Sequence, residues 1–442
     1  MERLELAGRP PLEGLIESED PDWIYMIQIR RPPGKPMFLV IRPIDRASVT
    51  KVVRLDPAGR ESLRREIQEF RNRAAIEAGR MEAVRLKPCE AEGNRYQRYS
   101  GRWFTLDSTA DETMTRRVIV RTEQIFAAYR QILPPRTTPA EPPRLVIFGS
   151  MASYQDFLGR LGVRMQNRAC FLAEKNLVAA GSELERLFES TAKTTAANDD
   201  LRRQLKNLEK RLPGRLRDLA DNLRKQGLPA SESQRLLGIE RHKFEEQSKR
   251  LRDEIDRSDR ESAGVFRKST AQTFARLAHE SFHAYLENYV YPHARYDVPS
   301  WLNEGLAVTF EGGMLEGETV RVDAPNFASL KKLKADLAAA EPLDLEKLLG
   351  AGPGVFLPLD RAAVPAAEQY YAYAWGLAYY LTFHQRLLGS PQVDRYVRRP
   401  GSAGCPSPPA EPAERFKDLV GMPLEPFDGQ WRQYILSLRC PP

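Results

Sequence analysis

The spacing of apolar residues in the first fifth of the chain predicts short strands. Residues 22–29 (DWIYMIQI) and 37–44 (MFLVIRPI) are rich in β-branched and aromatic side chains, and the segment RRPPGKP between them favours a turn. SVTKVVRL, residues 48–55, is a third candidate strand, and the charged residues 60–85 suit a helix. We therefore expect a small β-rich domain with a trailing helix over residues 1–90.

Strand and helix patterns alternate over residues 91–180. The apolar spacing predicts a strand, a helix that stops at Pro134, a second strand, a second helix that ends at a glycine, and a last strand. These elements are YQRYSGRWFTLDST (96–109), ETMTRRVIVRTEQIFAAYRQIL (112–133), RLVIFGS (144–150), MASYQDFLGRLG (151–162) and ACFLAEKNLVAAG (169–181).

The composition changes over residues 181–264, where leucines recur at spacings of four and three from Leu201 to Leu223 with charged residues between them. This is a heptad-like seam. Pro213 is expected to interrupt it and Gly227 to end it. We predict an inserted, coiled-coil-like helical arm that folds back on itself. Its role is either scaffolding, or one of two more specific roles: binding a protein partner or shielding the active site.

The segment LAHESFHAYL, residues 277–286, carries two of the chain's five histidines. His279 and His283 lie four residues apart, so on a helix both project from one side and can bind the same metal ion. Glu280 points in an adjacent direction, where it can reach a water on the metal without being a ligand. This is the reason for the H-E-x-x-H pattern. The alternative is an amphipathic helix that carries two histidines by chance.

A third ligand follows in SWLNEGLA, where Glu304 comes after 20 intervening residues. Pro299 and Ser300 favour the start of a helix there, and apolar residues surround the glutamate. Two imidazoles and one carboxylate make a catalytic zinc site with one position left for water, so one Zn²⁺ per chain is expected. Other divalent ions fit similar ligands.

HESFH followed by WLNEGLA resembles the gluzincin branch of the zincin metallopeptidases. More narrowly, it is similar to the peptidase-MA-like group of largely uncharacterised bacterial proteins. In that group a W-x-x-E-G-x-A segment follows the zinc helix, and a later helix resembles Y-A-x-A-W-A-L. This chain has YAYAWGL at residues 371–377, with Gly376 in place of alanine. The resemblance covers residue 95 to the C-terminus, less the arm. The G-x-M-E-N motif of alanyl-type aminopeptidases is absent before the zinc helix.

The resemblance implies an α+β, zincin-like metallopeptidase domain. Its N-terminal lobe would be residues 91–180 and its zinc-binding helical lobe residues 265–442. It also implies a tyrosine that stabilises the oxyanion; Tyr371 is the match, with Tyr370 and Tyr373 as alternatives. An extended substrate would pair with an edge strand, assigned to residues 176–180.

The predicted reaction is zinc-dependent hydrolysis of peptide bonds in peptide or protein substrates, in an endopeptidase-like manner. Its metal ligands are His279, His283 and Glu304, with Glu280 as general base. The alternative is a non-catalytic zinc-containing scaffold or binding protein, although a structural site has no need of Glu280. His293 lies in a predicted loop between the ligands and either supports them or, as we favour, lies at the surface. His242 and His384 have no partner in sequence and are expected to be structural or exposed.

Composition narrows these classes further. The net charge of +7 is modest for 442 residues because acids and bases interleave, so nucleic-acid binding by a basic coiled coil is the weakest alternative. No stretch reaches the ~20 apolar residues of a membrane span. The first residues lack a signal-peptide core, so a cytoplasmic protein is expected if this N-terminus is complete, and an exported one if a signal was trimmed.

Cysteine usage is sparse. None of the four cysteines forms a CxxC motif, and reduced thiols are expected. Cys405 and Cys440 would be able to pair in an exported protein.

Overall fold

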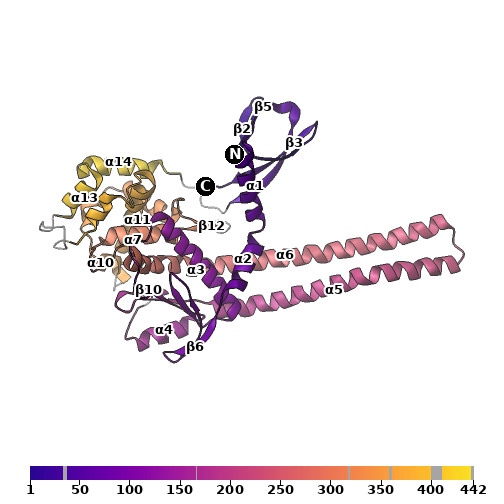
Figure 1. Ribbon diagram of the computed structural model, residues 1–442, viewed down its shortest axis with the longest axis horizontal. Coiled ribbons are helices and arrows are strands. Elements are labelled where there is room, and N and C mark those ends of the chain that lie inside the picture. Colours follow the sequence, from indigo (N-terminus) through magenta and orange to yellow (C-terminus); the bar gives the residue numbers. More distant parts are fainter. Residues whose placement is uncertain (33–36, 166, 317–318, 358–360, 400–410, 440–442) are drawn as a thin grey trace. The chain divides into compact units, whose positions relative to one another are not determined.

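The computed structural model of the protein describes residues 1–32, 37–165, 167–316, 319–357, 361–399 and 411–439. Within these ranges the strands form sheets of five, six and two strands, and the other elements are mainly helices (Figure 1). The protein is therefore of mixed α+β class with a β-rich N-terminal region, which confirms this part of the prediction.

The chain divides into two compact units. One combines Met1–Ile147, Arg164–Ala180 and Phe274–Pro442, and the other combines Phe148–Val163 and Gly181–Thr273. All of the candidate metal ligands belong to the first unit. The predicted arm, residues 181–264, belongs to the second.

The N-terminal sheet consists of β1 (Glu2–Leu6), β2 (Arg9–Glu19), β3 (Trp23–Arg30), β4 (Phe38–Asp45) and β5 (Val49–Val53). It is antiparallel with the order β4-β3-β2-β1-β5. One core cluster contains Leu4, Ile16 and Met26, and a second packs Leu15 and Ile27 against the following helix. The predicted helix over residues 60–85 is two helices, α1 (Pro57–Arg71) and α2 (Arg73–Ala83), which meet at Asn72.

The six-stranded sheet has the order β10-β11-β9-β8-β7-β6. Its strands are β6 (Lys87–Ala91), β7 (Asn94–Ser100), β8 (Thr105–Ser108), β9 (Arg144–Phe148), β10 (Ala169–Leu172) and β11 (Leu177–Gly181). Strands β8 and β9 are parallel, which requires a crossover connection, and α3 (Glu112–Ile132) supplies it. Asp111 caps α3 by accepting from the backbone N–H groups of Thr113 and Met114.

The prediction of one strand over residues 169–181 was wrong, because this segment is the β10–β11 hairpin. A short 3-10 turn and Asn176, whose φ of 47° is left-handed, reverse the chain between the two strands. Strand β11 lies between β10 and β9, so both of its edges are paired. The free edge that we assigned to residues 176–180 therefore belongs to β10.

The C-terminal part of the first unit is mostly helical. It contains α7 (Ser300–Glu311), the hairpin β12 (Met314–Glu316) and β13 (Thr319–Arg321), α8 (Phe327–Leu337), α9 (Leu345–Leu349), α10 (Pro353–Phe356), α11 (Val364–Tyr379), α12 (Pro391–Tyr396), α13 (Pro412–Val420) and α14 (Leu424–Ser437). Its core includes the fully buried Trp301, Trp375 and Trp431. Helices α7 and α11 approach very closely at Gly305, where a Cβ atom would lie 2.2 Å from the carbonyl oxygen of Ala374.

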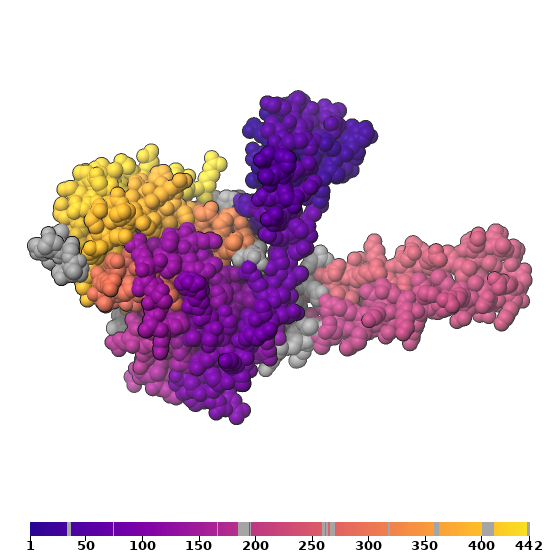
Figure 2. All heavy atoms as spheres, viewed as in Figure 1, coloured from indigo at the N-terminus to yellow at the C-terminus, as the bar shows by residue number. Residues whose placement is uncertain are grey.

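The arm is a hairpin of α5 (Leu184–Lys225) and the first part of α6 (Ala230–Tyr285). Ion pairs join the two helices, with Arg252 2.6 Å from Glu209 and Arg215 2.8 Å from Glu240. Figure 2 shows them in contact along the arm. Pro213 lies inside α5 and does not interrupt it, contrary to our expectation.

Helix α6 extends well beyond the predicted end of the arm. The boundary that we placed after residue 264 falls inside α6, so one helix continues from the arm to the histidine motif.

Two further predictions concern features outside the core of the fold. No helix within the described ranges combines the length and apolarity that crossing a membrane requires, as predicted. Cys405 and Cys440 lie outside the described residues, and their pairing stays a prediction.

Candidate metal centre

The last turns of α6 carry the two histidines on a helix end that is fixed by buried contacts. Leu277, Phe282 and Tyr285 are almost completely buried. The Tyr285 hydroxyl donates to the carbonyl oxygen of Leu133 at 2.6 Å, and the Tyr129 hydroxyl donates to that of Ala278. Hydrogen bonds to Leu133 and from Tyr129 therefore fix the end of α6 that carries the histidines.

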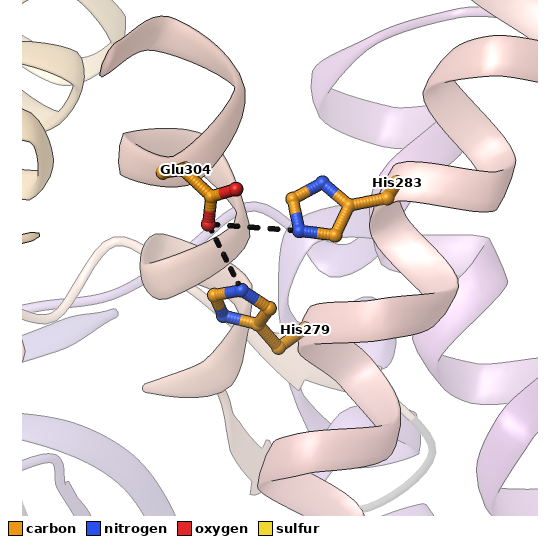
Figure 3. Close-up of side chains that lie close together, drawn as sticks. All are labelled: His279, His283 and Glu304. Carbon is orange, nitrogen blue, oxygen red and sulfur yellow. Dashed lines mark hydrogen bonds and ion pairs between the residues drawn. The ribbon is translucent and has the colours of Figure 1, made fainter. Parts of the chain in front are cut away.

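Helix α7 places Glu304 opposite these histidines. The helix begins after Pro299, and Trp301, Leu302 and Leu306 anchor it in the core. The contact of Gly305 with α11 leaves no space for a side chain on that face. Glu304 points the other way, towards α6 (Figure 3).

One carboxylate oxygen of Glu304 faces both imidazoles. Glu304 Oε2 lies 3.2 Å from Nε2 of His279 and 3.6 Å from Nε2 of His283. One candidate ligand atom from each of the three residues lies within 4.8 Å of the others. Among the described residues, this is the only group of three or more His, Cys, Asp or Glu side chains so placed. The structure thus brings together the three residues that we predicted to be metal ligands.

The other ring nitrogen of each histidine is held by a neighbour from α7. Nδ1 of His283 lies 2.8 Å from Oδ1 of Asn303, and Nδ1 of His279 lies 3.2 Å from Oε2 of Glu311. Both oxygens accept, so both Nδ1 atoms carry the proton and both Nε2 atoms face Glu304. Metal-binding histidines are commonly oriented in this way by a carboxylate or a carbonyl group.

Sequence reasoning missed Asn303 and Glu311. A signal for each was present, because Asn303 directly precedes Glu304, and Glu311 follows Glu304 by seven residues, or about two helical turns. Neither spacing distinguishes a supporting residue from a solvated one. Only the packing of α7 on α6 identifies their role.

His279 and Glu304 each change the pKa of the other. Burial lowers the pKa of His279, but hydrogen bonds to Glu304 and Glu311 outweigh this effect and raise it to about 10. Burial raises the pKa of Glu304, but the nearby charges of His283 and His279 outweigh this and leave it below its usual value. A cation that binds at these groups therefore competes with a proton for His279.

Glu280 is half-buried beside the cluster and is not one of its three ligands. Burial is the largest effect on its carboxyl group and raises its pKa, whereas the charges of His279 and His283 act in the opposite direction. A hydrogen bond from the backbone of Phe171 also lowers it. Phe171 belongs to β10, so the edge strand of the six-stranded sheet lies against the predicted general base.

The structure distinguishes the three candidate tyrosines. The ring of Tyr371 lies 6.3 Å from that of His279, and its hydroxyl donates to the carbonyl oxygen of Phe356 at 3.0 Å. Burial, together with the charges of Glu304 and Glu280, raises its pKa. Tyr373 instead donates to Asp336 at 2.6 Å, and Tyr370 packs against Phe356. Of the three, Tyr371 is the one recorded in contact with a candidate ligand.

The remaining histidines lie elsewhere. His293 and His242 are exposed, and the exposed ring of His384 stacks on Tyr380. None of them belongs to the cluster of candidate ligands.

The donor set suits a zinc ion. Ligand atoms placed tetrahedrally at roughly 2 Å from an ion lie about 3.3 Å apart, close to the 3.2 and 3.6 Å found here between nitrogen and oxygen atoms. The histidines offer their Nε2 atoms with the Nδ1 atoms already bonded. Two of the three distances between candidate ligand atoms therefore fit such an ion, and all three atoms lie within 4.8 Å of one another.

Comparison with known proteins identifies one family. Residues 273–388 match the model of a family described as "Protein of unknown function (DUF1570)". The matched segment includes the three candidate ligands, Glu280 and Tyr371. No curated protein and no solved structure matches the chain.

Proposed function

We propose that the protein is a zinc-dependent peptidase of the gluzincin type, with a zincin-like fold around the metal centre. The observation that carries the proposal is the convergence of both His Nε2 atoms on one Glu304 oxygen, with Glu280 beside them. A site that only stabilised the fold would need no half-buried carboxylate next to its ligands.

The groups around the ligands suit hydrolysis of a peptide bond. A zinc ion held by His279, His283 and Glu304 would supply a Lewis acid that polarises the carbonyl and makes a water molecule more acidic. Glu280 would accept the proton of the attacking water and donate it to the leaving amine. The raised pKa of Glu280 suits both steps.

Tyr371 would stabilise the negative charge that develops on the carbonyl oxygen. Its hydroxyl is a neutral donor at neutral pH, because a tyrosine ordinarily loses its proton only near pH 10 and burial raises the pKa of Tyr371 further. A single donor of this type commonly contributes a factor of about 10² to 10³ to the rate. To donate to a substrate, the hydroxyl must exchange its present acceptor, the carbonyl oxygen of Phe356.

The edge strand β10 favours extended substrates. Its outer edge is not paired within the six-stranded sheet, and Phe171 on this strand already reaches Glu280. A peptide that adds to this edge as a further strand would pass beside the general base. This supports an endopeptidase-like reaction in the middle of a chain.

The test begins with metal content. Mass spectrometry of the metals in purified wild type should find near one zinc per chain, and His283→Ala should lose it. His293→Ala is the matched control, since that exposed side chain makes no contact with the cluster, and it should keep the metal.

Hydrolysis is tested separately with a peptide library and Glu280→Gln. We expect chelator-sensitive cleavage by the wild type, and a zinc-loaded Glu280→Gln protein that cleaves about 10²- to 10⁴-fold more slowly. Zinc in the wild type without any cleavage would favour the non-catalytic scaffold. Wild type that binds no zinc would refute the metal centre itself.

A further inference from the structure

An arginine stands next to the metal centre on the same helix. Arg276 precedes His279 by three residues and Glu280 by four, so the three share one face of α6. Its side chain is 58% exposed to solvent, whereas the side chains of His279 and Glu304 are 6% and 15% exposed. Arg276 is therefore far more accessible to solvent than these two candidate ligands, and more accessible than Glu311, whose side chain is 23% exposed.

The guanidinium group of Arg276 is only loosely engaged. Nη1 lies 3.8 Å from Oε1 of Glu311, beyond hydrogen-bond distance, and Oε2 of that carboxylate is already bonded to His279. Within the described part of the chain, no hydrogen bond of Arg276 is recorded. A guanidinium has five N–H donors, so most of those of Arg276 remain available to another group.

The field of Arg276 extends over the site. Its charge lowers the pKa of Glu311, against the larger effect of burial, and it opposes the factors that raise the pKa of Tyr371. The charge of Arg276 thus acts on Glu311, which contacts His279, and on Tyr371, the candidate oxyanion donor.

We propose that Arg276 determines specificity by binding a carboxylate of the peptide substrate close to the scissile bond. This inference rests on the proposed peptidase function. Arginine binds carboxylates through two parallel N–H···O bonds, which a neutral amide cannot match.

The distances agree with a carboxylate on a residue near the reacting carbonyl. Three or four helical residues rise about 4.5 to 6 Å along α6, and neighbouring Cα atoms of an extended substrate lie about 3.8 Å apart. A substrate that places its carbonyl at the ligands thus brings the next side chain or a terminal carboxylate within reach of the arginine. The carboxylate has two possible sources, an Asp or Glu side chain and a free C-terminus.

The test measures binding, so that it does not depend on hydrolysis. Three peptide hydroxamates, which bind zinc directly, are titrated into zinc-loaded protein: one has an Asp side chain and an amidated C-terminus, one has Asn and a free C-terminus, and the reference has Asn and an amidated C-terminus. We expect wild type to bind one carboxylate probe about ten- to a hundredfold more tightly than the reference. Which probe gains identifies the source.

Variants then assign the preference to the arginine. Arg276→Gln should reduce the ratio between the affinities for the favoured carboxylate probe and for the neutral reference to near one. Arg276→Lys should retain part of this preference. Arg95→Gln, in a side chain that is 91% exposed on β7, is the matched control and should keep the full ratio. Equal losses for charged and neutral probes in Arg276→Gln would show that the arginine only supports Glu311, and would overturn the proposal.

Failure of this inference differs from failure of the proposed function. A wild-type protein that binds all three hydroxamates equally refutes the role of Arg276, even if it cleaves peptides. A protein that prefers the carboxylate probe but cleaves no peptide supports carboxylate binding by Arg276 and refutes the peptidase. A protein that binds no zinc overturns both.

Discussion

At the scale of single residues, the support of His279 by Glu311 can be tested directly. Their hydrogen bond of 3.2 Å fixes the orientation of the ring, and Glu311→Gln removes the negative charge that favours its Nδ1–H. Loss of such a partner typically costs a factor of 10 to 100 in metal affinity. We expect a decrease of this size in zinc affinity, measured by competition with a chelating dye. Glu341→Gln, at an exposed glutamate, should leave the affinity unchanged; equal affinity in both variants would contradict a role for Glu311.

Two tyrosines of α11, Tyr371 and Tyr373, allow a variant of the proposed oxyanion donor to be compared with a control on the same helix. Tyr371→Phe should keep its zinc and lower the rate of peptide hydrolysis by about 10²- to 10³-fold, because it removes the proposed oxyanion donor. Tyr373→Phe removes a hydrogen bond to Asp336 instead and should lower the free energy of unfolding by about 1 to 3 kcal/mol. Steady-state kinetics and chemical denaturation separate the two. Ordinary activity in Tyr371→Phe would show that this tyrosine only packs the core.

The cluster of candidate ligands could be predicted from sequence, and the residues that contact it could not. His279 and His283 stand at a spacing that has one simple geometric meaning on a helix, and few histidines compete for it. Glu311 and Arg276 are charged residues on helices, a pattern that mostly indicates a solvated surface. The position of Glu311 beside the candidate ligands depends on how α7 packs against α6, which local spacing does not encode. Arg276 lies three residues before His279 on the same helix, so its position follows from spacing, but its function does not.

At the scale of elements, the close contact of α7 and α11 determines where Glu304 lies. The expected clash of a Cβ at residue 305 is with backbone of α11, which cannot rotate away. Gly305→Ala should therefore lower the free energy of unfolding by several kcal/mol and also reduce zinc affinity, because α7 has to shift.

The control for this variant is a helical glycine in open space. No atom lies within 4 Å of a Cβ built on Gly79 of α2, so Gly79→Ala should raise the free energy of unfolding by about 0.5 to 1 kcal/mol. Thermal and chemical denaturation compare the two. Similar small effects would mean that α7 and α11 do not depend on this contact.

Sequence patterns predicted most elements but not their ends. Strands β3, β4 and β5 and helix α3 follow from their apolar spacing, whereas β2 begins with Arg9, Pro10 and Pro11 and was missed. The β10–β11 hairpin was read as one strand because its turn relies on a left-handed Asn176, without glycine or proline. Gly376 stands where the motif has alanine, and a Cβ there would lie 2.4 Å from Cδ2 at the end of the Leu333 side chain, which would have to move.

At the scale of the whole molecule, the candidate metal centre and the arm are parts of different compact units that share α6. Residues 274–285 of this helix belong to the first unit and residues 230–273 to the second. Composition indicated that the arm was distinct, but a change in composition does not show that a helix continues across it. The assignment of residues 148–163 to the arm's unit has no signal in the sequence, since it depends on contacts distant along the chain.

This division predicts where zinc should stabilise the chain. Zinc that binds only the folded protein adds about 4 kcal/mol of stability at a concentration a thousandfold above its dissociation constant. The ligands lie on α6 and α7, so the added stability should protect the backbone amides of residues 274–285 and 300–311 from hydrogen exchange. Helix α5 carries no ligand, and its amides should exchange at the same rate with and without zinc.

Hydrogen exchange with mass spectrometry, after chelation and after addition of zinc, makes this comparison peptide by peptide. Zinc-dependent protection is expected to decline along α6 within one or two turns before His279. The reason is that opening of a more distant turn does not require the zinc to leave its ligands. His283→Ala should show no zinc-dependent protection anywhere. Equal zinc-dependent protection of α5 and α7 in wild type would contradict this prediction. It would show that the two units unfold together and that zinc binding stabilises the arm as well.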